Sequence, residues 1–322
     1  MIEKVLQNCG KCGLCLNVCP VYKILKEEQV SPRAKLQLIK AYDNSILDAS
    51  PLLKEIVSKC LMCGSCAANC PSGINHYSKF MEMRKKMAKT QGEAPAIKSM
   101  IYMLAREYRL KFGAGLAKAG QRFIPDSFAR NYKLGNIPLK NFPKLNSIPL
   151  RNANDTVILP DKKQIGIVVY FTGCATNYLF DDTGLASIGI LKHMGYKIII
   201  PKDQTCCSIP LLFHGAEDLA FKNIITNINA LKGHDPDAIL VDCSTCGEAL
   251  KNEYPDMIER RGLNPFDANA ISSKVMDILS FIDQHFDLLE FDLNFKENFA
   301  VTYHAPCHTK NNSGSHLIVE NL

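Results

Sequence analysis

The chain has no long apolar run and none of the common nucleotide-binding motifs. Spanning a bilayer takes about 18 or more consecutive apolar residues, whereas the longest candidates here are 165–171 and 196–201. No G-x-G-x-x-G, P-loop lysine motif or flavin fingerprint is present, so hydride or phosphoryl chemistry within this chain is unsupported and no catalytic residues are predicted. With 322 residues, 47% of them apolar, the sequence predicts a folded protein of about two domains that does not cross a membrane.

Cysteine, by contrast, is abundant, with fourteen residues, and no secretory signal precedes the first of them. Thiols stay reduced in the cytosol, so we expect a cytoplasmic protein whose cysteines bind metal rather than a disulfide framework. Eight cysteines fall in two near-identical runs, Cys9-x2-Cys12-x2-Cys15-x3-Cys19-Pro20 and Cys60-x2-Cys63-x2-Cys66-x3-Cys70-Pro71. Each run matches the ligand loop of a bacterial-type 4Fe-4S cluster.

The spacing of the two runs predicts two clusters that exchange a ligand. Three thiolates three residues apart can wrap three corners of a cubane, while the proline turns the chain away, so the fourth cysteine ligates the other cluster. We assign Cys9, Cys12, Cys15 and Cys70 to one cluster and Cys60, Cys63, Cys66 and Cys19 to the other. Gly13 and Gly64 let backbone amides approach the cluster sulfides. Structural zinc is the alternative, but it typically uses two separated C-x2-C pairs rather than two interlocked sets of four.

Positive charge is concentrated in one segment. Residues 76–140 hold fourteen Lys or Arg against four acidic residues, a net +10, so the rest of the chain contributes −4 to the total of +6. Within this segment, 97–123 interleaves apolar and basic residues as a pair of basic amphipathic helices would. Such a surface suits an acidic partner subunit or anionic lipid, giving peripheral contact with the inner face of the cell membrane. The alternative is an apolar stripe packed on its own domain; no nucleic-acid recognition module accompanies the charge.

Four segments follow along the chain. Residues 1–90 are predicted to form a helical ferredoxin-type domain with two 4Fe-4S clusters, in which Ser31 and Pro32 start one helix and 51–59 forms another. Residues 91–160 hold the basic helices and a proline-rich linker or wrapping arm over 124–155. Residues 161–298 are predicted to alternate strands with helices, and 299–322 begin a further unit. The strands are expected at 165–171, 197–200 and 238–241 and the helices at 184–194 and 214–231, which indicates a parallel sheet. The predicted fold class is therefore α+β multidomain.

Five further cysteines follow these strands: Cys174 comes after the first, Cys206 and Cys207 after the second, and Cys243 and Cys246 after the third. Because the carboxyl ends of adjacent parallel strands converge on one crevice, the five sulfurs can meet there. The sequence therefore predicts a cluster or metal site at this edge of the sheet.

This arrangement resembles the cysteine-rich CCG domain of the heterodisulfide reductase B subunit family. Combined with two ferredoxin motifs, it resembles the iron-sulfur subunits of glycolate oxidase, of related lactate-oxidising enzymes and of anaerobic glycerol-3-phosphate dehydrogenase. Supporting fragments are Ser31-Pro32-Arg33, Cys70-Pro71-Ser72-Gly73, Thr172-Gly173-Cys174 and His214-Gly215. The family commonly has glycine where this chain has Ser208, and we expect the turn to tolerate serine.

The resemblance implies an electron-transfer subunit. It would pass electrons from a partner FAD-linked dehydrogenase of a 2-hydroxy acid or glycerol 3-phosphate toward a quinone or other acceptor. The five-cysteine site would hold a third 4Fe-4S cluster, of the noncubane kind, with zinc or a reactive thiol pair at Cys206 and Cys207 as alternatives. Reduction of a disulfide at this site, or a non-redox metal-binding module, are the competing functions.

Residues 303–308 resemble the start of a second CCG repeat after a predicted strand at 299–302. No second vicinal cysteine pair follows, so Cys307 would be an orphan ligand of an incomplete repeat. A truncated product or a fragment is the favoured explanation, ahead of a missing half supplied by another chain. His304 and His308 could be ligands in an intact repeat, but ordinary loop histidines are the simpler interpretation.

Overall fold

The computed structural model describes residues 9–123, 133–134, 137–138, 141, 143–289, 302 and 304–308. The chain divides into two compact units. The first comprises Met1–Ile101, Ile209–Ala220 and Tyr303–Glu320, and the second comprises Tyr102–Ser208, Phe221–Thr302 and the last two residues. No described helix is long and apolar enough to cross a membrane.

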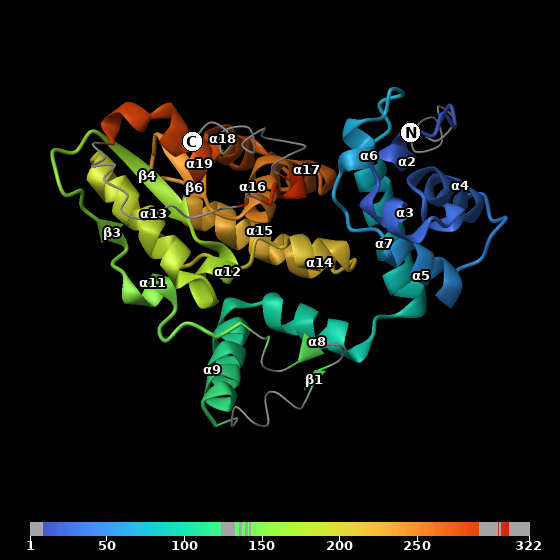
Figure 1. Cartoon of the computed structure of the whole chain (residues 1–322), viewed down its shortest axis with the longest axis horizontal. Helices are drawn as coiled ribbons and strands as arrows, with labels where there is room; N and C mark the ends of the chain where they lie inside the picture. The colour runs from blue at the N-terminus through green and yellow to red at the C-terminus, as the bar shows by residue number, and fades with distance from the viewer. Residues whose placement is uncertain are drawn as a thin grey trace. The chain divides into compact units, whose positions relative to one another are not determined.

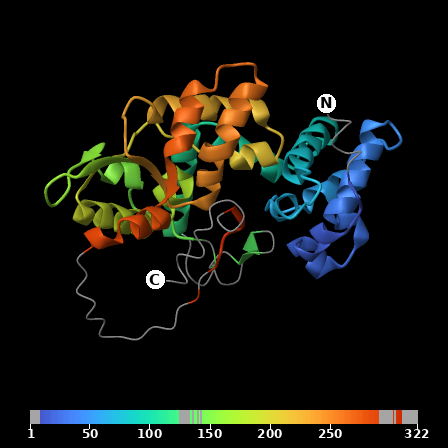
Figure 2. The ribbon, with the colours of Figure 1, turned by 90° about the horizontal axis from the view of Figure 1, so that it is seen from above.

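The first unit consists of helices and the loops between them, with no strand among its described residues (Figures 1 and 2). Its helices are α2 (Leu14–Asn17), α3 (Pro20–Leu25), α4 (Pro32–Asp43), α5 (Pro51–Ser58), α6 (Ser65–Ala68), α7 (His76–Gln91) and α14 (Ile209–Phe213). Helix α7 packs against α4, α5, α6 and α14. The predicted helical ferredoxin-type domain is therefore confirmed as to fold.

Local signals set where these helices begin. The Ser31 hydroxyl accepts a hydrogen bond from the backbone N–H of Ala34 at 3.1 Å, and Pro32 occupies the first position of α4. Helix α5 begins in the same way, because Ser50 accepts from the N–H of Leu53 at 3.1 Å. A serine cap followed by proline satisfies an unpaired amide and presets the first helical turn. The expected helix starts are therefore found.

The second unit is built on a five-stranded sheet in the order β3-β5-β4-β6-β7. Its strands are β3 (Val157–Ile158), β4 (Gly166–Phe171), β5 (Tyr196–Ile199), β6 (Ala238–Val241) and β7 (Val275–Asp277). Strands β4 to β7 pair in parallel, and only β3 is antiparallel, at the edge beside β5. The predicted α/β domain with a parallel sheet is confirmed, with β3 and β7 added to the three expected strands.

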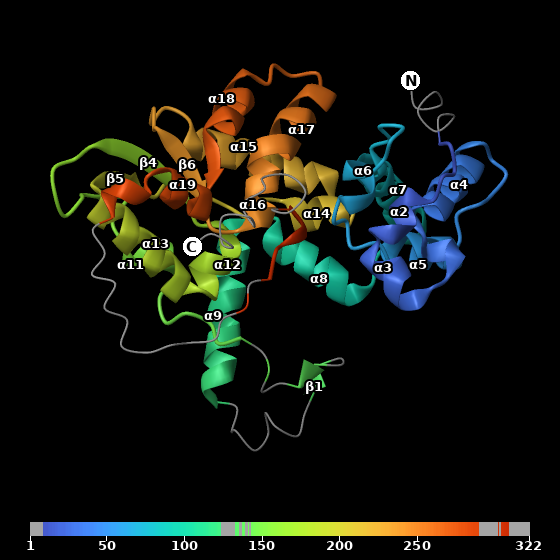
Figure 3. The same ribbon diagram turned by 45° about the horizontal axis from the view of Figure 1, so that its top comes forward.

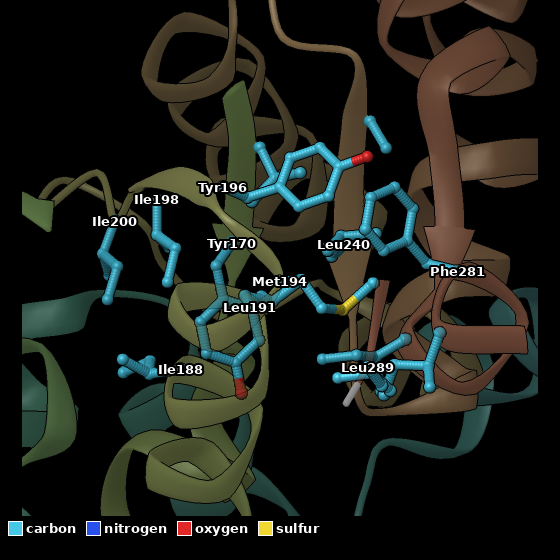
Figure 4. Packing of buried hydrophobic residues seen from close by; sticks show 14 of the residues in the cluster. Tyr170, Ile188, Leu191, Met194, Tyr196, Ile198, Ile200, Leu240, Phe281 and Leu289 are labelled. Atoms are coloured by element: carbon cyan, nitrogen blue, oxygen red, sulfur yellow. The ribbon is translucent and has the colours of Figure 1, made fainter. Parts of the chain in front are cut away.

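One face of this sheet carries the main core of the unit. Tyr170, Ile198 and Leu240 point from neighbouring strands into a cluster with Leu191 of α13 (Asp181–Met194) and Phe281 of α19 (Ile278–Gln284), as Figure 4 shows. The residues in between along β4 and β6, such as Val169 and Ile239, are buried on the other face. Burial on both faces explains why these strands read as unbroken apolar runs.

The unit contains further elements besides these strands and the two helices of its core. They are α9 (Glu107–Phe123), the short antiparallel pair β1 (Lys133–Leu134) and β2 (Ile137–Pro138), α11 (Leu150–Ala153), α12 (Gly173–Tyr178), α15 (Glu217–Leu231), α16 (Ser244–Glu248), α17 (Tyr254–Arg260) and α18 (Phe266–Lys274). Helix α8 (Pro95–Leu104) precedes α9. The pair of helices expected over 97–123 is thus found as α8 and α9.

Two sequence expectations were wrong in detail. The helix expected at 214–231 begins only at Glu217, because Gly215 adopts a left-handed conformation with φ of 71° and interrupts it. The proline-rich stretch 124–155 is also not wholly irregular, since it contains β1, β2 and α11. The strand expected at 299–302 lies outside the described residues except for Thr302.

Candidate iron–sulfur sites

The two cysteine runs adopt the same backbone conformation. Lys11 and Met62, each directly before the second cysteine of its run, have φ of 53° and 54°. Gly13 and Gly64, directly after that cysteine, have φ of 83° and 74°. Left-handed residues alternating with right-handed ones turn successive N–H groups toward one concave side, which favours binding of an anion. Both loops are therefore shaped to wrap a negatively charged group.

Each loop then enters a four-residue helix that carries the third cysteine. Cys15 lies in α2 and Cys66 in α6, both are buried, and the two helices pack against each other. The fourth cysteines have different surroundings. Cys19 caps helix α3 and accepts a hydrogen bond from the N–H of Tyr22 at 3.4 Å, whereas Cys70 leads into a turn. The mutual packing of α2 and α6 brings the two runs side by side.

One pocket brings together the four thiols expected to share a cluster across the two runs. Cys19 from the first run and Cys60, Cys63 and Cys66 from the second line it, and most of its other lining residues are apolar. They include Pro20, Val21, Pro32, Leu61, Met62, Tyr77 and Phe80, and the charged Lys35 lies among them. A group with four soft ligands can be enclosed here away from water.

The other predicted set is more exposed. Cys15 is buried, Cys9 and Cys70 are half-buried, and Cys12 is exposed. Burial raises the pKa of Cys15, and the nearby Cys9 and Cys12 raise it further. The structure thus places the first three cysteines of the run around one point. It places Cys70 directly after the end of α6, the helix that packs on α2.

Burial also raises the pKa of Cys60 and Cys66 in the pocket. Thiols with raised pKa values ionise when a metal centre binds them, because the metal charge outweighs the cost of burying a thiolate. Buried thiols in an apolar, cation-containing pocket therefore fit an iron–sulfur group better than they fit reactive cysteines, which need lowered pKa values and exposure.

In the second unit, all five predicted cysteines come into contact. Hydrogen bonds join their thiols in the order Cys174, Cys206, Cys207, Cys246 and Cys243. Cys174 stands at the start of α12 after β4, the vicinal pair follows β5, and the last two flank the start of α16 after β6. Three strands that are adjacent in the sheet thus deliver five sulfurs to one place, as their order in the sheet requires.

The thiols of this row are not electrostatically equal. Hydrogen bonds from Cys206 and Cys246 lower the pKa of Cys207 to about 6. A hydrogen bond from Cys246 and two backbone N–H groups lower the pKa of Cys243 to about 6. The pKa of Cys174 is raised, first by its hydrogen bond to Cys206 and then by burial. Two of the five are therefore favoured as thiolates, the form that binds iron or zinc.

The backbone at Gly173 passes too close to these thiols to carry a side chain. Gly173 has φ of 61°, and a β-carbon placed there would lie 2.8 Å from the sulfur of Cys246. Among the described residues, no group of three or more Cys, His, Asp and Glu side chains is arranged to hold a metal ion. The fit to an iron–sulfur group therefore rests on the number, softness and common location of the thiols.

Three buried polar residues that the sequence did not single out hold the cysteine loops. Gln204 accepts from the N–H of Thr172 at 3.0 Å and donates to the carbonyl of Tyr170 at 2.9 Å, which ties the loop before Cys206 to the end of β4. Asn227 of α15 donates to the carbonyl of Cys206 at 3.1 Å and accepts from the N–H of Thr205 at 2.7 Å.

The third, Arg151 of α11, is 3% exposed and donates to the carbonyl of Gln204 and to the carboxylate of Glu107. Asn227 interrupts the apolar stripe of its helix, and such a polar position in an apolar stripe is a signal that the sequence offers for a buried polar residue.

The remaining predicted site residues lie near the end of the described chain. Cys307 and His304 are exposed, and His308 is half-buried.

Comparison with known proteins defines the class of protein that carries these sites. Residues 5–74 match the model of the 4Fe-4S dicluster domain, and residues 168–251 match that of the Cysteine-rich domain, CCG. The chain is thus an iron–sulfur protein that combines a dicluster domain with a CCG domain, and the resemblance predicted from its sequence is confirmed.

Particular relatives are similar over nearly the whole chain. The chain is 28% identical to the probable glycolate oxidase iron-sulfur subunit of Bacillus subtilis, over 97% of this chain and 72% of that protein. It is also 28% identical to the B subunit of fumarate reductase (CoM/CoB) of Methanothermobacter marburgensis, over 98% of this chain but only 54% of that protein. The D subunit of the heterodisulfide reductase of Methanosarcina mazei is 25% identical over 94% of this chain and 68% of its own length. No solved structure matches the chain.

These relatives are subunits of oxidoreductases, which supports a role in electron transfer beside a catalytic partner.

Proposed function

We propose that this chain is an electron-transfer subunit that relays single electrons between a partner dehydrogenase and a terminal acceptor. The pocket that joins Cys19 of the first run to Cys60, Cys63 and Cys66 of the second carries this proposal. Zinc sites built from separate C-x2-C pairs would not need a ligand from the other run. A shared ligand set is what two neighbouring 4Fe-4S clusters require.

In this proposal two 4Fe-4S clusters are held by interlocked ligand sets. One set is Cys9, Cys12, Cys15 and Cys70, and the other is Cys60, Cys63, Cys66 and Cys19. Such clusters store and pass one electron at a time. The protein supplies the thiolates, the amide-lined loops at Gly13 and Gly64, and a dry surround at the second set.

The five-cysteine site of the second unit is proposed to hold a third cluster. Its ligands would be Cys174, Cys206, Cys207, Cys243 and Cys246, which already lie in one row of contacting thiols. Zinc would need only four of the five. The fifth thiol is therefore an argument for a larger metal group.

The partner is proposed to be an FAD-linked dehydrogenase of a 2-hydroxy acid, such as glycolate or lactate, or of glycerol 3-phosphate. Such a partner would remove two electrons and two protons from its substrate and release the electrons singly to this chain. A quinone or another acceptor would take them up in pairs. The relatives named as glycolate oxidase subunits support this assignment.

Helix α9 supports a proposed contact with a membrane surface on the acceptor side. Tyr108, Phe112 and Leu116 are spaced four residues apart along one side of the helix and are 67%, 67% and 59% exposed. Figure 3 shows α9 extending away from the sheet of its own unit. The alternative, in which this stripe packs on its own domain, is therefore not found in the described part of the chain. An exposed apolar stripe on a basic helix suits an anionic lipid interface.

The test of the proposed function is anaerobic purification followed by iron and sulfide analysis and electron paramagnetic resonance. Cys12→Ser is expected to remove the signal of the cluster in the first run, and Cys63→Ser that of the cluster in the second run, so these two variants assign the two signals. Because the fourth ligand crosses over, Cys19→Ser is expected to give the same spectral loss as Cys63→Ser, and Cys70→Ser the same loss as Cys12→Ser. Cys307→Ser is the control and should leave both signals intact.

Two outcomes would contradict the proposal. Zinc without sulfide in the purified protein would exclude the relay. A spectrum of Cys19→Ser that matches Cys12→Ser would show that each run ligates its own cluster without exchange.

A further inference from the structure

We propose that Lys35 and Arg84 raise the reduction potential of the cluster at Cys60, Cys63, Cys66 and Cys19 above that of the cluster at Cys9, Cys12, Cys15 and Cys70. Electrons would then pass one at a time from the first cluster to the second and collect there. This inference rests on the proposed function and adds a direction to it. It concerns two cations that the ferredoxin motif does not specify.

Lys35 places a buried positive charge beside the second set of thiols. It is 2% exposed, and it lines the same pocket as Cys19, Cys60 and Cys66. Its ammonium group donates to the backbone carbonyl of Val30, and no carboxylate pairs with it among the described contacts. A lysine buried without an acidic partner is costly unless negative charge lies nearby. Cluster thiolates would provide that charge.

Arg84 of α7 adds a second cation to the same set. Its guanidinium donates to the carbonyl oxygens of Cys60 and Ser58, the latter at 2.8 Å, and to that of Phe213 at 3.3 Å. All the described acceptors of this arginine are backbone carbonyls, which are neutral. The guanidinium remains protonated under all ordinary conditions. Glu93 lies near enough to interact electrostatically with Arg84, but Glu93 is itself paired with Lys54 at 3.1 Å. Positive charge therefore remains on Arg84 at the first cysteine of the second run.

The first set of thiols has no comparable buried cation among the described residues. Arg33 approaches its loop, since its Nη1 lies 3.2 Å from the place of a β-carbon on Gly13. However, the side chain of Arg33 is 37% exposed and is paired with Glu28 at 2.7 Å. An exposed pair of opposite charges exerts little net field, because water screens it and the two charges oppose each other. Cys12 of this set is itself exposed.

The different surroundings of the two thiol sets determine which cluster has the higher reduction potential. Reduction adds a negative charge to a cluster, so a nearby cation stabilises the reduced form and raises the potential. The interaction is stronger inside the protein than in water, because the effective dielectric constant is lower. The Cys60 set has one buried and one half-buried cation to which no carboxylate is hydrogen-bonded in the described contacts, whereas the cation beside the Cys9 set, Arg33, is exposed and paired with Glu28. The Cys60 set should therefore be reduced first.

The test is a redox titration of the holoprotein followed by electron paramagnetic resonance, with the signals assigned through Cys12→Ser and Cys63→Ser. In the unsubstituted protein, the Cys63-dependent signal is expected at the higher potential. Lys35→Met should lower that potential by about 59 mV or more, which corresponds to at least a tenfold change in the one-electron equilibrium constant. The potential of the Cys12-dependent signal should hardly change. Lys40→Met is the matched control, because Lys40 lies on the same helix but not in the pocket.

The inference would be overturned if the Cys12-dependent signal had the higher potential, or if Lys35→Met shifted both signals equally or neither. If Lys35→Met fails to assemble its cluster, the order of the two potentials in the unsubstituted protein still tests the inference. Arg84→Met provides a second variant and is expected to lower the potential of the Cys63-dependent signal. Protein without iron and sulfide would contradict the proposed function instead. The two failures are therefore distinguishable.

Discussion

At the scale of single residues, Ser208 shows how the five-cysteine site constrains the backbone. It directly follows Cys207, is fully buried and has φ of 78°. A residue with a β-carbon in the left-handed region costs about 1–2 kcal/mol. Its hydroxyl donates to the carbonyl of Cys206 at 3.4 Å, which is long for a hydrogen bond. The glycine common in the resembling family at this position thus has a conformational reason.

Ser208→Gly is therefore expected to raise the free energy of unfolding of the anaerobic holoprotein by about 1 kcal/mol, measured as a shift in the urea midpoint. The matched control is Ser273→Gly in the last turn of α18, where glycine should cost up to about 0.5–1 kcal/mol. A lower midpoint for Ser208→Gly would show that the hydroxyl contributes more than the strain costs.

At the scale of secondary structure, α9 differs from the other helices of its unit. Helix α13 covers the sheet with a buried stripe that includes Ile188 and Leu191, whereas the apolar stripe of α9 is exposed. The amphipathic pattern is visible in both sequences. Only the fold shows that one stripe meets a sheet and the other meets solvent.

Vesicle binding tests the membrane contact proposed for α9. We expect the protein to bind phosphatidylglycerol vesicles and to bind phosphatidylcholine vesicles far more weakly, because the basic residues attract anionic headgroups. Phe112→Ser with Leu116→Ser should weaken binding roughly tenfold or more, as two apolar side chains leave the interface. Phe266→Ser is the control, since Phe266 is 72% exposed on α18. Equal binding to both vesicles, or no loss in the α9 variant, would contradict the proposal.

At the scale of the whole molecule, the question is whether the five-cysteine site is the exit of a relay or a place where a disulfide is reduced. Relatives named as heterodisulfide reductase subunits keep the second function in view. The lowered pKa of Cys207 and Cys243 would suit thiolate ligands in either case. The two functions differ in what oxidises the reduced protein.

We expect Cys207→Ala to leave both ferredoxin-type signals unchanged and to slow reoxidation of the reduced protein by a soluble quinone by at least tenfold. The reason is that the proposed exit site would lose a ligand, while the proposed entry clusters would keep theirs. Stopped-flow absorbance under anaerobic conditions measures the rate, with Cys307→Ala as the control. Unchanged reoxidation would remove the five-cysteine site from the route, and rapid oxidation by a disulfide would favour the reductase.

Local features of the chain were predictable without a structure. The cysteine spacings, the Ser31–Pro32 helix start and the apolar runs at β4 and β6 each depend on neighbours within a few residues or on burial of both faces. The convergence of the five cysteines also followed, because parallel strands end at one edge of a sheet. The start of α15 was missed because Gly215, which interrupts the helix, was read as part of it.

The sequence by itself thus determined the cofactor chemistry, the two classes of domain and the order of elements, because thiol spacing and hydrophobic pattern are local properties. Tertiary structure alone decided that Lys35 shares a pocket with four thiols, that Arg151 and Asn227 hold the loop of the vicinal cysteines, and that the stripe of α9 stays exposed. The hydrogen bonds of Arg151 and Asn227 join residues 53 and 21 positions apart, and the exposure of the α9 stripe depends on the absence of a packing partner among the described residues. No local pattern encodes these contacts or this exposure, because they depend on how distant segments of the chain pack.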